Sequence, residues 1–402
     1  MNTLKNQNKN LMILGVCPDQ FPFIQELLDD GYRLIFCERD QINIDKLSCL
    51  LSDNRYANKI TVYKCDLADK DKLLDIATQE KVDALIPVPL GKVISTVGYI
   101  NSRLNLPGVS YDACLNFTDK QKVYELLKQN NLNCASQWNA TELSKVTFPC
   151  IVKPRFGCGS RGVKIANNYQ ELVDACDFCK QDFSPVEDKD ILVEEVIEGD
   201  EFICDFFVKD GQIIPYLILK KSLTALPYRQ EITYEDNSLT NEELSLVSSY
   251  VSKCAKFLKI NNTVVTCDLI LSPKGPCIVD IAARFTGNYV CCIAKAKGED
   301  LGRMYLDFIF NKKLPEIPQN LPKAYFSMFN LDSGELASVP ENVNSATFIA
   351  ENNLKVGDKI TRVTNGRGLL SRGFALCLDN DIEHAKQRVN NYLKQFIVKT
   401  DH

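Results

Sequence analysis

The sequence predicts an α/β fold in which a parallel βαβ region comes first and antiparallel hairpins follow. In the first hundred residues, short apolar runs alternate with helical patterns, as in LMILGV, FIQELLDDG and RLIFCE, which is typical of a parallel sheet covered by helices. Farther along, two apolar runs joined by Asp210 and Gly211 predict a hairpin. The 402 residues are 45% apolar, enough for two or three domains with a sizeable core.

The composition argues against several classes of function. The formal net charge is −5, and a nucleic-acid partner requires a basic face, so we expect no such partner. The apolar run from Leu11 to Cys17 is too short to span a bilayer, so we expect a cytoplasmic protein with no membrane partner. The only histidines are His384 and His402, which argues against a histidine base or a histidine-bound metal.

Seventeen cysteines are scattered through the chain, many of them in apolar runs such as ICDFFV. An odd number in such positions is typical of buried thiols. Cys176 and Cys179 have C-x-x-C spacing, but no second pair or histidine stands nearby to complete a tetrahedral site. We therefore expect no zinc.

The elements after the first hundred residues can be placed in order. The strands PCIV and ILVEEVI enclose a glycine-rich loop and a helix, and TVVTCDLILS and PCIVDIAARF are joined by a turn at Pro273 to Gly275. Apolar periodicity predicts helices over 119–130, 169–180, 241–258 and 382–396. In the first region, the turn GVCPDQ lacks the G-x-G-x-x-G of a dinucleotide site.

The stretch IVKPRFGCGSRGV places Lys153 at the end of an apolar run, followed by Gly157, Gly159 and Gly162. Glycines at this density either make a bare turn or let backbone N–H groups close around an anion, and the lysine favours the second reading. An exposed lysine at a strand end is the alternative.

Taken in order, the motifs resemble the ATP-grasp superfamily over about residues 115 to 300. They are Asp119-Lys120 at a helix start, Lys153 in V-K-P, the glycine loop with Ser160, an E-E-x-x-x-G-x-E segment from Glu194 to Glu201, and acidic strands at Asp268 and Asp280. The resemblance implies a Rossmann-like pre-grasp domain (1–115), an ATP-grasp domain (116–318, with lobes 116–200 and 201–318) and a C-terminal α+β lobe (319–402).

The resemblance also implies that the protein binds ATP with Mg²⁺ or Mn²⁺. The two lysines would place compact charges on the phosphates, and the loop would close over them with its N–H groups. The segment LVEEVIEGDEF would hold adenine through Glu194 and the backbone of Glu195 to Ile197, and Glu201 would bind ribose. The expected ATP contacts are Lys120, Lys153, Gly157, Gly159, Ser160, Gly162, Glu194, Glu195, Ile197 and Glu201.

Asp268 and Asp280 each lie within an apolar run on neighbouring strands of a predicted hairpin. A carboxylate there is costly unless it meets a cation, so the pair predicts a Mg²⁺ site completed by the nucleotide phosphates. Arg284 is the expected catalytic residue, which would meet the transferring phosphoryl group. The chain departs from the family pattern E-x-N-x-R at Asp280 and Ala282, and Thr286 replaces a glycine of the following loop.

The reaction implied is ligation, in which ATP phosphorylates a carboxylate and an amine displaces the phosphate. Such chemistry needs positioning and charge neutralisation more than a protein nucleophile. A single grasp unit resembles amino-acid or dipeptide ligases more than a full carbamoyl-phosphate synthetase, so we expect small-molecule carboxylate and amine substrates, with Lys220, Lys221 and Arg229 as candidate substrate ligands. A bicarbonate-activating carboxylase-type ligase and an ATP-binding sensor or scaffold stay open, and a homodimer is compatible with the sequence.

Overall fold

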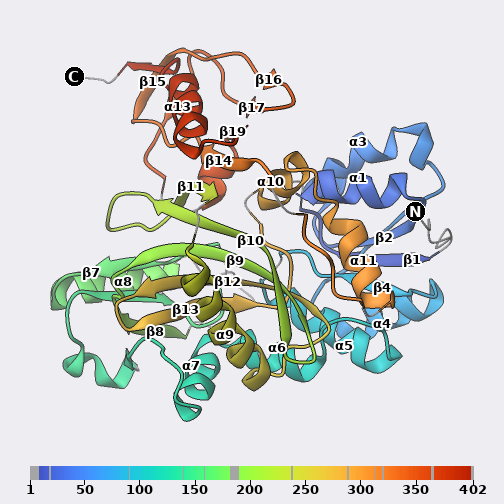
Figure 1. Ribbon diagram of the computed structural model, residues 1–402, viewed down its shortest axis with the longest axis horizontal. Coiled ribbons are helices and arrows are strands. Elements are labelled where there is room, and N and C mark those ends of the chain that lie inside the picture. Colours follow the sequence, from blue (N-terminus) through green and yellow to red (C-terminus); the bar gives the residue numbers. More distant parts are fainter. Residues whose placement is uncertain are drawn as a thin grey trace.

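The fold is mixed α/β, which confirms the predicted fold class (Figure 1). A computed structural model describes residues 9–17, 20–89, 91–138, 140–157, 159–181, 190–236, 239–287, 289–311, 313–318, 321–363 and 366–399. One residue of the glycine-rich loop, Cys158, and one of the loop after the second acidic strand, Asn288, lie outside this set. Within the described ranges, every helix is too short or too polar to cross a bilayer.

The N-terminal region contains a parallel sheet in the order β3-β2-β1-β4. The alternating strands and helices of the first hundred residues are therefore a βαβ region, as predicted. The strands are β1 (Asn10–Leu14), β2 (Arg33–Glu38), β3 (Ile60–Lys64) and β4 (Ala84–Ile86), and the helices are α1 (Phe21–Asp29), α2 (Gln41–Ile44), α3 (Ser48–Leu51), α4 (Lys70–Gln79), α5 (Ile94–Leu104) and α6 (Tyr111–Phe117).

A small antiparallel sheet, in the order β5-β8-β6-β7, follows helix α7 (Lys120–Gln129). Asp119 caps this helix, because its side chain accepts hydrogen bonds from the backbone N–H groups of Gln121 and Lys122. Helix α8 (Tyr169–Gln181) packs on β6 and β7 and buries Cys176 and Cys179. The strands are β5 (Gln137–Trp138), β6 (Cys150–Pro154), β7 (Lys164–Ala166) and β8 (Ile191–Glu195).

The largest sheet has nine antiparallel strands in the order β13-β12-β9-β10-β11-β14-β19-β17-β16. It runs without a break into the C-terminal region, because β11 pairs with β14. The sequence did not predict this continuity. The strands are β9 (Asp200–Lys209), β10 (Gln212–Leu223), β11 (Glu231–Asp236), β12 (Thr263–Ser272), β13 (Gly275–Ala282), β14 (Lys323–Met328), β16 (Val343–Asn344), β17 (Phe348–Asn352) and β19 (Gly373–Asp379).

The remaining elements pack on this sheet or on α1, or form a separate antiparallel sheet in the order β18-β15-β20 in the C-terminal region (Figure 1). A capping box at Thr240 and Glu243 starts α9, whose apolar side joins the core on one face of the large sheet. The closing helix was predicted over 382–396, but the observed helix α13 ends at Leu393, and a strand begins at Ile397. These elements are α9 (Asn241–Phe257), α10 (Val290–Ala296), α11 (Leu301–Asn311), α12 (Gly366–Leu370), α13 (Ile382–Leu393), β15 (Gly334–Ser338), β18 (Lys359–Ile360) and β20 (Ile397–Lys399).

Candidate active site

One face of the nine-stranded sheet gathers the charged residues that the sequence singled out. Strand β9 alternates, so that Phe202, Cys204 and Phe206 join the core shared with α9, while Glu201 and Asp205 point to the opposite side. Asp268 of β12 pairs directly with Asp280 of β13. Residues paired across antiparallel strands share a face, and the register therefore confirms that the two aspartates lie side by side.

Lys120 is the first residue of α7, and its side chain extends to the large sheet. Its Nζ donates to the carbonyl oxygen of Gly157 at 2.7 Å and lies 3.4 Å from Oδ1 of Asp280. One ammonium group therefore joins the glycine-rich loop to a predicted metal ligand. Arg155 fixes this end of α7 through its ion pair with Asp119, at 2.6 Å, and the pair lowers the pKa of Asp119 although burial opposes it.

Lys153 is buried, with 7% of its surface exposed, so it is not an exposed strand-end lysine. Its Nζ lies 2.8 Å from Oε2 of Glu194 and donates to the carbonyl oxygen of Val279 at 3.0 Å and to the hydroxyl of Tyr124 at 3.2 Å. Gln137 donates a further hydrogen bond to Glu194. The carboxylate of Glu194 therefore holds Lys153 against β13, beside Asp280.

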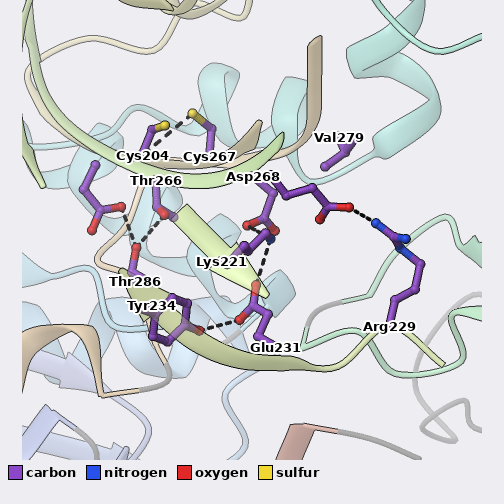
Figure 2. Close-up of polar contacts among 12 residues, drawn as sticks. Cys204, Lys221, Arg229, Glu231, Tyr234, Thr266, Cys267, Asp268, Val279 and Thr286 are labelled. Atoms are coloured by element: carbon purple, nitrogen blue, oxygen red, sulfur yellow. Dashed lines mark hydrogen bonds and ion pairs between the residues drawn. The ribbon is translucent and has the colours of Figure 1, made fainter. Parts of the chain in front are cut away.

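A second buried lysine, Lys221 of β10, lies between two carboxylates (Figure 2). Its Nζ is 2.7 Å from Oδ1 of Asp268 and 2.9 Å from Oε1 of Glu231, and the hydroxyl of Tyr234 donates to the other oxygen of Glu231 at 2.6 Å. Burial lowers the pKa of Lys221, but the two carboxylates outweigh it and raise the pKa. Burial raises the pKa of Asp268, and the charges of Glu231 and Asp280 add to this effect, whereas Lys221 opposes it.

The three candidate substrate cations do not converge on one point. Lys220 precedes Lys221 on β10, so their side chains leave opposite faces of the strand, and Lys220 pairs with Asp200 at 2.7 Å. Arg229 forms an ion pair with Glu201, the predicted ribose ligand (Figure 2). Of the three, Lys221 and Arg229 contact predicted nucleotide or metal ligands.

The backbone that the sequence assigned to adenine lies between the two sheets. Glu195 ends β8, and its N–H donates to the carbonyl oxygen of Ser136. Ile197 lies in the link 196–199, which leads from β8 into β9. This link connects the sheet that bears Lys153 to the sheet that bears Asp280.

Arg284 and Thr286 follow β13, next to the buried carboxylate of Asp205. The Arg284 guanidinium donates to the carbonyl oxygen of Phe285 at 2.8 Å. The Thr286 hydroxyl is hydrogen-bonded to Asp205 and to Thr266 (Figure 2). Thr286 stands where the family pattern has a glycine. Its hydroxyl thus connects the loop after β13 to the neighbouring strands.

Asp205 should make the stability of the protein depend on pH. Burial raises its pKa from 3.8 to about 6, although hydrogen bonds from Thr286 and Thr266 oppose the shift. Since the folded pKa is the higher one, this contribution is fully present below pH 3.8 and is lost as the pH rises through 6. The shift corresponds to roughly 3 kcal/mol.

Asp205→Asn cannot titrate, so its free energy of unfolding should fall less steeply than that of the wild type between pH 4 and 7. Urea unfolding at several pH values measures this difference. The exposed Asp332→Asn serves as the control and should retain the wild-type slope. Equal slopes for Asp205→Asn and the wild type would contradict the assignment.

The glycine-rich loop adopts left-handed backbone conformations between β6 and β7. The φ angles are +67° at Gly159, +52° at Ser160 and +68° at Gly162. Gln230 donates to the carbonyl oxygen of Ser160 at 3.2 Å, so the loop also contacts the connection between β10 and β11. A β-branched residue is disfavoured at such angles.

Gly159→Val should therefore distort the loop and lower substrate-dependent phosphate release roughly 5- to 30-fold, with ATP still bound through the lysines. An added Cβ would meet nothing within 4 Å, so the effect comes from backbone strain of about 1–2 kcal/mol. Gly159→Asn is the matched control, because asparagine tolerates this conformation and should retain more turnover. Phosphate release and ATP calorimetry distinguish the variants, and equal loss in both would show that strain is not the cause.

The carboxylate oxygens of Asp268 and Asp280 are of the kind that Mg²⁺ prefers, and nucleotide oxygens and water would have to supply the other ligands. Over the described ranges, no group of three or more His, Cys, Asp or Glu side chains is arranged to hold a metal ion. Ala282, paired with Thr266 next to the aspartates, has no side-chain oxygen to add.

Comparison with known protein families assigns the central region of the chain to a class of protein. Residues 146–292 match the family model of the ATP-grasp domain, which confirms the resemblance that the motifs indicated.

Particular relatives support the same class. The chain is 23% identical over 295 residues, 68% of its length, to the carbamoyl phosphate synthase large chain of Thermoanaerobacter sp., and 29% identical over 164 residues, 39% of its length, to D-alanine–D-alanine ligase A of Bacillus cereus. It spans only 27% and 49% of these two relatives. In fold it is similar to an L-amino acid ligase from Bacillus licheniformis, with a TM-score of 0.77 and 18% identity over 99% of this chain and 100% of that one.

Several residues of the site escaped the sequence analysis. The sequence carries the same signal for Asp205 as for Asp268 and Asp280, a carboxylate within the apolar run ICDFFV, and alternation along β9 places Asp205 on the face of Glu201. Glu231 follows Arg229 and Gln230 and so lacks the apolar residues that flank Asp268 and Asp280 on both sides. Tyr124 and Arg155 gave no signal, because their importance comes from partners far away in the sequence.

Proposed function

We propose that the protein is an ATP-dependent ligase that activates a small carboxylic acid, such as an amino acid, as an acyl-phosphate and joins it to an amine with formation of a C–N bond. One observation carries the proposal. Two lysines from the smaller-sheet side, Lys120 and Lys153, contact adjacent residues of β13, Asp280 and Val279. Two lysine cations and a carboxylate that could bind a metal ion therefore lie together at β13. This arrangement suits the binding of a polyphosphate.

Each residue has a role in this proposal. Lys120 and Lys153 bind the phosphates, and the N–H groups of the glycine-rich loop cover them and exclude water. A Mg²⁺ ion held by Asp268 and Asp280 would neutralise phosphate charge. Arg284 stabilises the transferring phosphoryl group.

The nucleoside part of ATP would lie along the link between β8 and β9. The N–H of Glu195 already donates to Ser136, so the carbonyl oxygen of Glu195 and the backbone of Ile197 would bind adenine, and Glu201 would accept hydrogen bonds from the ribose hydroxyls. Because Glu201 pairs with Arg229 in the structure, ribose binding displaces Arg229, which is then available to a substrate carboxylate. The relatives support the reaction class, since both carry the names of a synthase or a ligase.

Phosphate release from ATP, measured with a panel of amino acids and amines, tests the proposal. We expect release that requires both a carboxylate and an amine. Release that requires bicarbonate instead would indicate a carboxylase-type reaction. ATP binding without any substrate-dependent release would indicate a sensor or scaffold, for which the departures at Ala282 and Thr286 are the sequence evidence.

A further inference from the structure

Glu201, the expected ribose ligand, already has a partner in the protein. It lies near the start of β9, on the same face as Asp268, because Asp268 pairs with Ile203 two residues farther along the strand. The carboxylate of Glu201 forms an ion pair with the guanidinium of Arg229 (Figure 2). Only 20% of the Arg229 side chain and 15% of the Glu201 side chain are exposed. Arg229 therefore holds the acceptor that the ribose hydroxyls would need.

The backbone on both sides of Arg229 is fixed by contacts with the small-sheet side of the site. The ring of Tyr228 packs on Phe178 of α8, with the ring centroids 5.6 Å apart. Gln230 donates to the carbonyl oxygen of Ser160 in the glycine-rich loop at 3.2 Å. Since both neighbours of Arg229 are held, release of the carboxylate requires only a change of the Arg229 side-chain rotamer.

Ribose and Arg229 therefore compete for one carboxylate. Binding of ribose forms hydrogen bonds to a charged acceptor, but it also breaks an ion pair between two mostly covered side chains. The affinity gained from the sugar is reduced by the fraction of molecules in which the carboxylate is occupied. Selectivity is a difference between two affinities. A competitor that opposes only nucleotides with sugar hydroxyls therefore weakens the preference for such nucleotides.

We infer that Arg229 determines how strongly the site selects a nucleotide by its sugar, because it competes with the ribose hydroxyls for Glu201. The inference rests on the proposed function, which assigns ribose to Glu201. It goes beyond that function by giving Arg229 a role in nucleotide selectivity before any carboxylate substrate binds.

Arg229→Met tests the inference in the full-length protein. Calorimetry in the presence of Mg²⁺ measures the affinities for ATP and for 2′,3′-dideoxy-ATP. The two nucleotides carry the same phosphates, so the ratio of their affinities cancels the effect of removing a positive charge nearby. We expect the preference for ATP to rise roughly 5-fold or more over that of the wild type, because the competing ion pair is absent. An unchanged or smaller ratio would overturn the inference.

Two comparisons show whether the effect depends on Glu201. Arg33→Met is the matched control, because Arg33 forms an ion pair of similar burial with Glu80 in the parallel sheet, at 2.7 Å, and the wild-type ratio is expected. In a Glu201→Gln background, Arg229→Met should leave the ratio unchanged, since the carboxylate for which Arg229 competes is gone. An equal rise in that background would contradict the inference.

Arg229→Lys decides the question if Arg229→Met does not fold. Lysine keeps the positive charge but lacks the planar fork that binds a carboxylate through two bonds. We expect the preference for ATP to lie between those of the wild type and Arg229→Met, and a wild-type ratio would count against the inference. Failure of the wild type to bind either nucleotide would instead overturn the proposed function, and this inference with it.

Discussion

Asp280→Asn should reduce substrate-dependent phosphate release by roughly 100-fold or more, because metal-based charge stabilisation is worth several kcal/mol. It should also remove the protection against hydrogen exchange that ATP confers on residues 159–162. Lys120 links Asp280 to the glycine-rich loop through Gly157, so metal, phosphate and loop are expected to respond together. The change leaves the loop sequence untouched.

Hydrogen exchange with and without ATP separates this coupling from a direct effect on the loop. Without ATP, Asp280→Asn and the wild type should exchange alike at these residues, since Lys120 keeps its bond to Gly157. The exposed Asp332→Asn should behave as the wild type in both assays. Full turnover and full ATP-dependent protection in Asp280→Asn would show that the Asp280 carboxylate is not a metal ligand.

Lys153→Met should lower the free energy of unfolding by about 3–5 kcal/mol, because it leaves Glu194 as a buried carboxylate without its cation. Glu194 is only 2% exposed. A loss of ATP affinity in this single variant would therefore mix instability with the missing phosphate contact. Urea unfolding measures the first effect and calorimetry the second.

The double variant Lys153→Met with Glu194→Gln separates the two effects. Removing both charges should restore much of the stability, since the glutamine can still accept the hydrogen bond from Gln137. ATP should nevertheless bind roughly 10- to 100-fold more weakly than to Glu194→Gln alone, because a charge-assisted contact of about 1.5–3 kcal/mol is absent. Wild-type ATP affinity in the double variant would limit Lys153 to a structural role.

Local signals predicted most of the elements and the acidic hairpin, although the closing helix ends at Leu393 and not at residue 396. The cap at Asp119, the start of α9 at Asn241 and the turn at Pro273 to Gly275 depend on neighbouring residues, and the sequence contains all of them. The direct pairing of Asp268 with Asp280 does not follow from the turn alone. The register that begins at Ser272 and Gly275 would pair Asp268 with Val279, and a bulge between Asp268 and Leu269 shifts the partner to Asp280.

Long-range partners could not be predicted in the same way. Glu194 and Lys153 are diagonal neighbours on paired strands β8 and β6, a relation that depends on the register between strands separated by a helix. Alternation of apolar residues shows which side of a strand is buried, but it does not identify the next strand of the sheet. The pairing of β11 with β14, and the position of Lys221 between Asp268 and Glu231, are of this kind.

The pairing of β11 with β14 has a consequence for shortened forms of the protein. A chain that ended at residue 318 would keep every predicted ATP and metal ligand, yet it would turn β11 into an open edge. The N–H and C=O groups of residues 233–235, which now pair with β14, would be available to any other extended chain. Such a fragment is expected to self-associate, so the C-terminal region protects solubility as well as completing the fold.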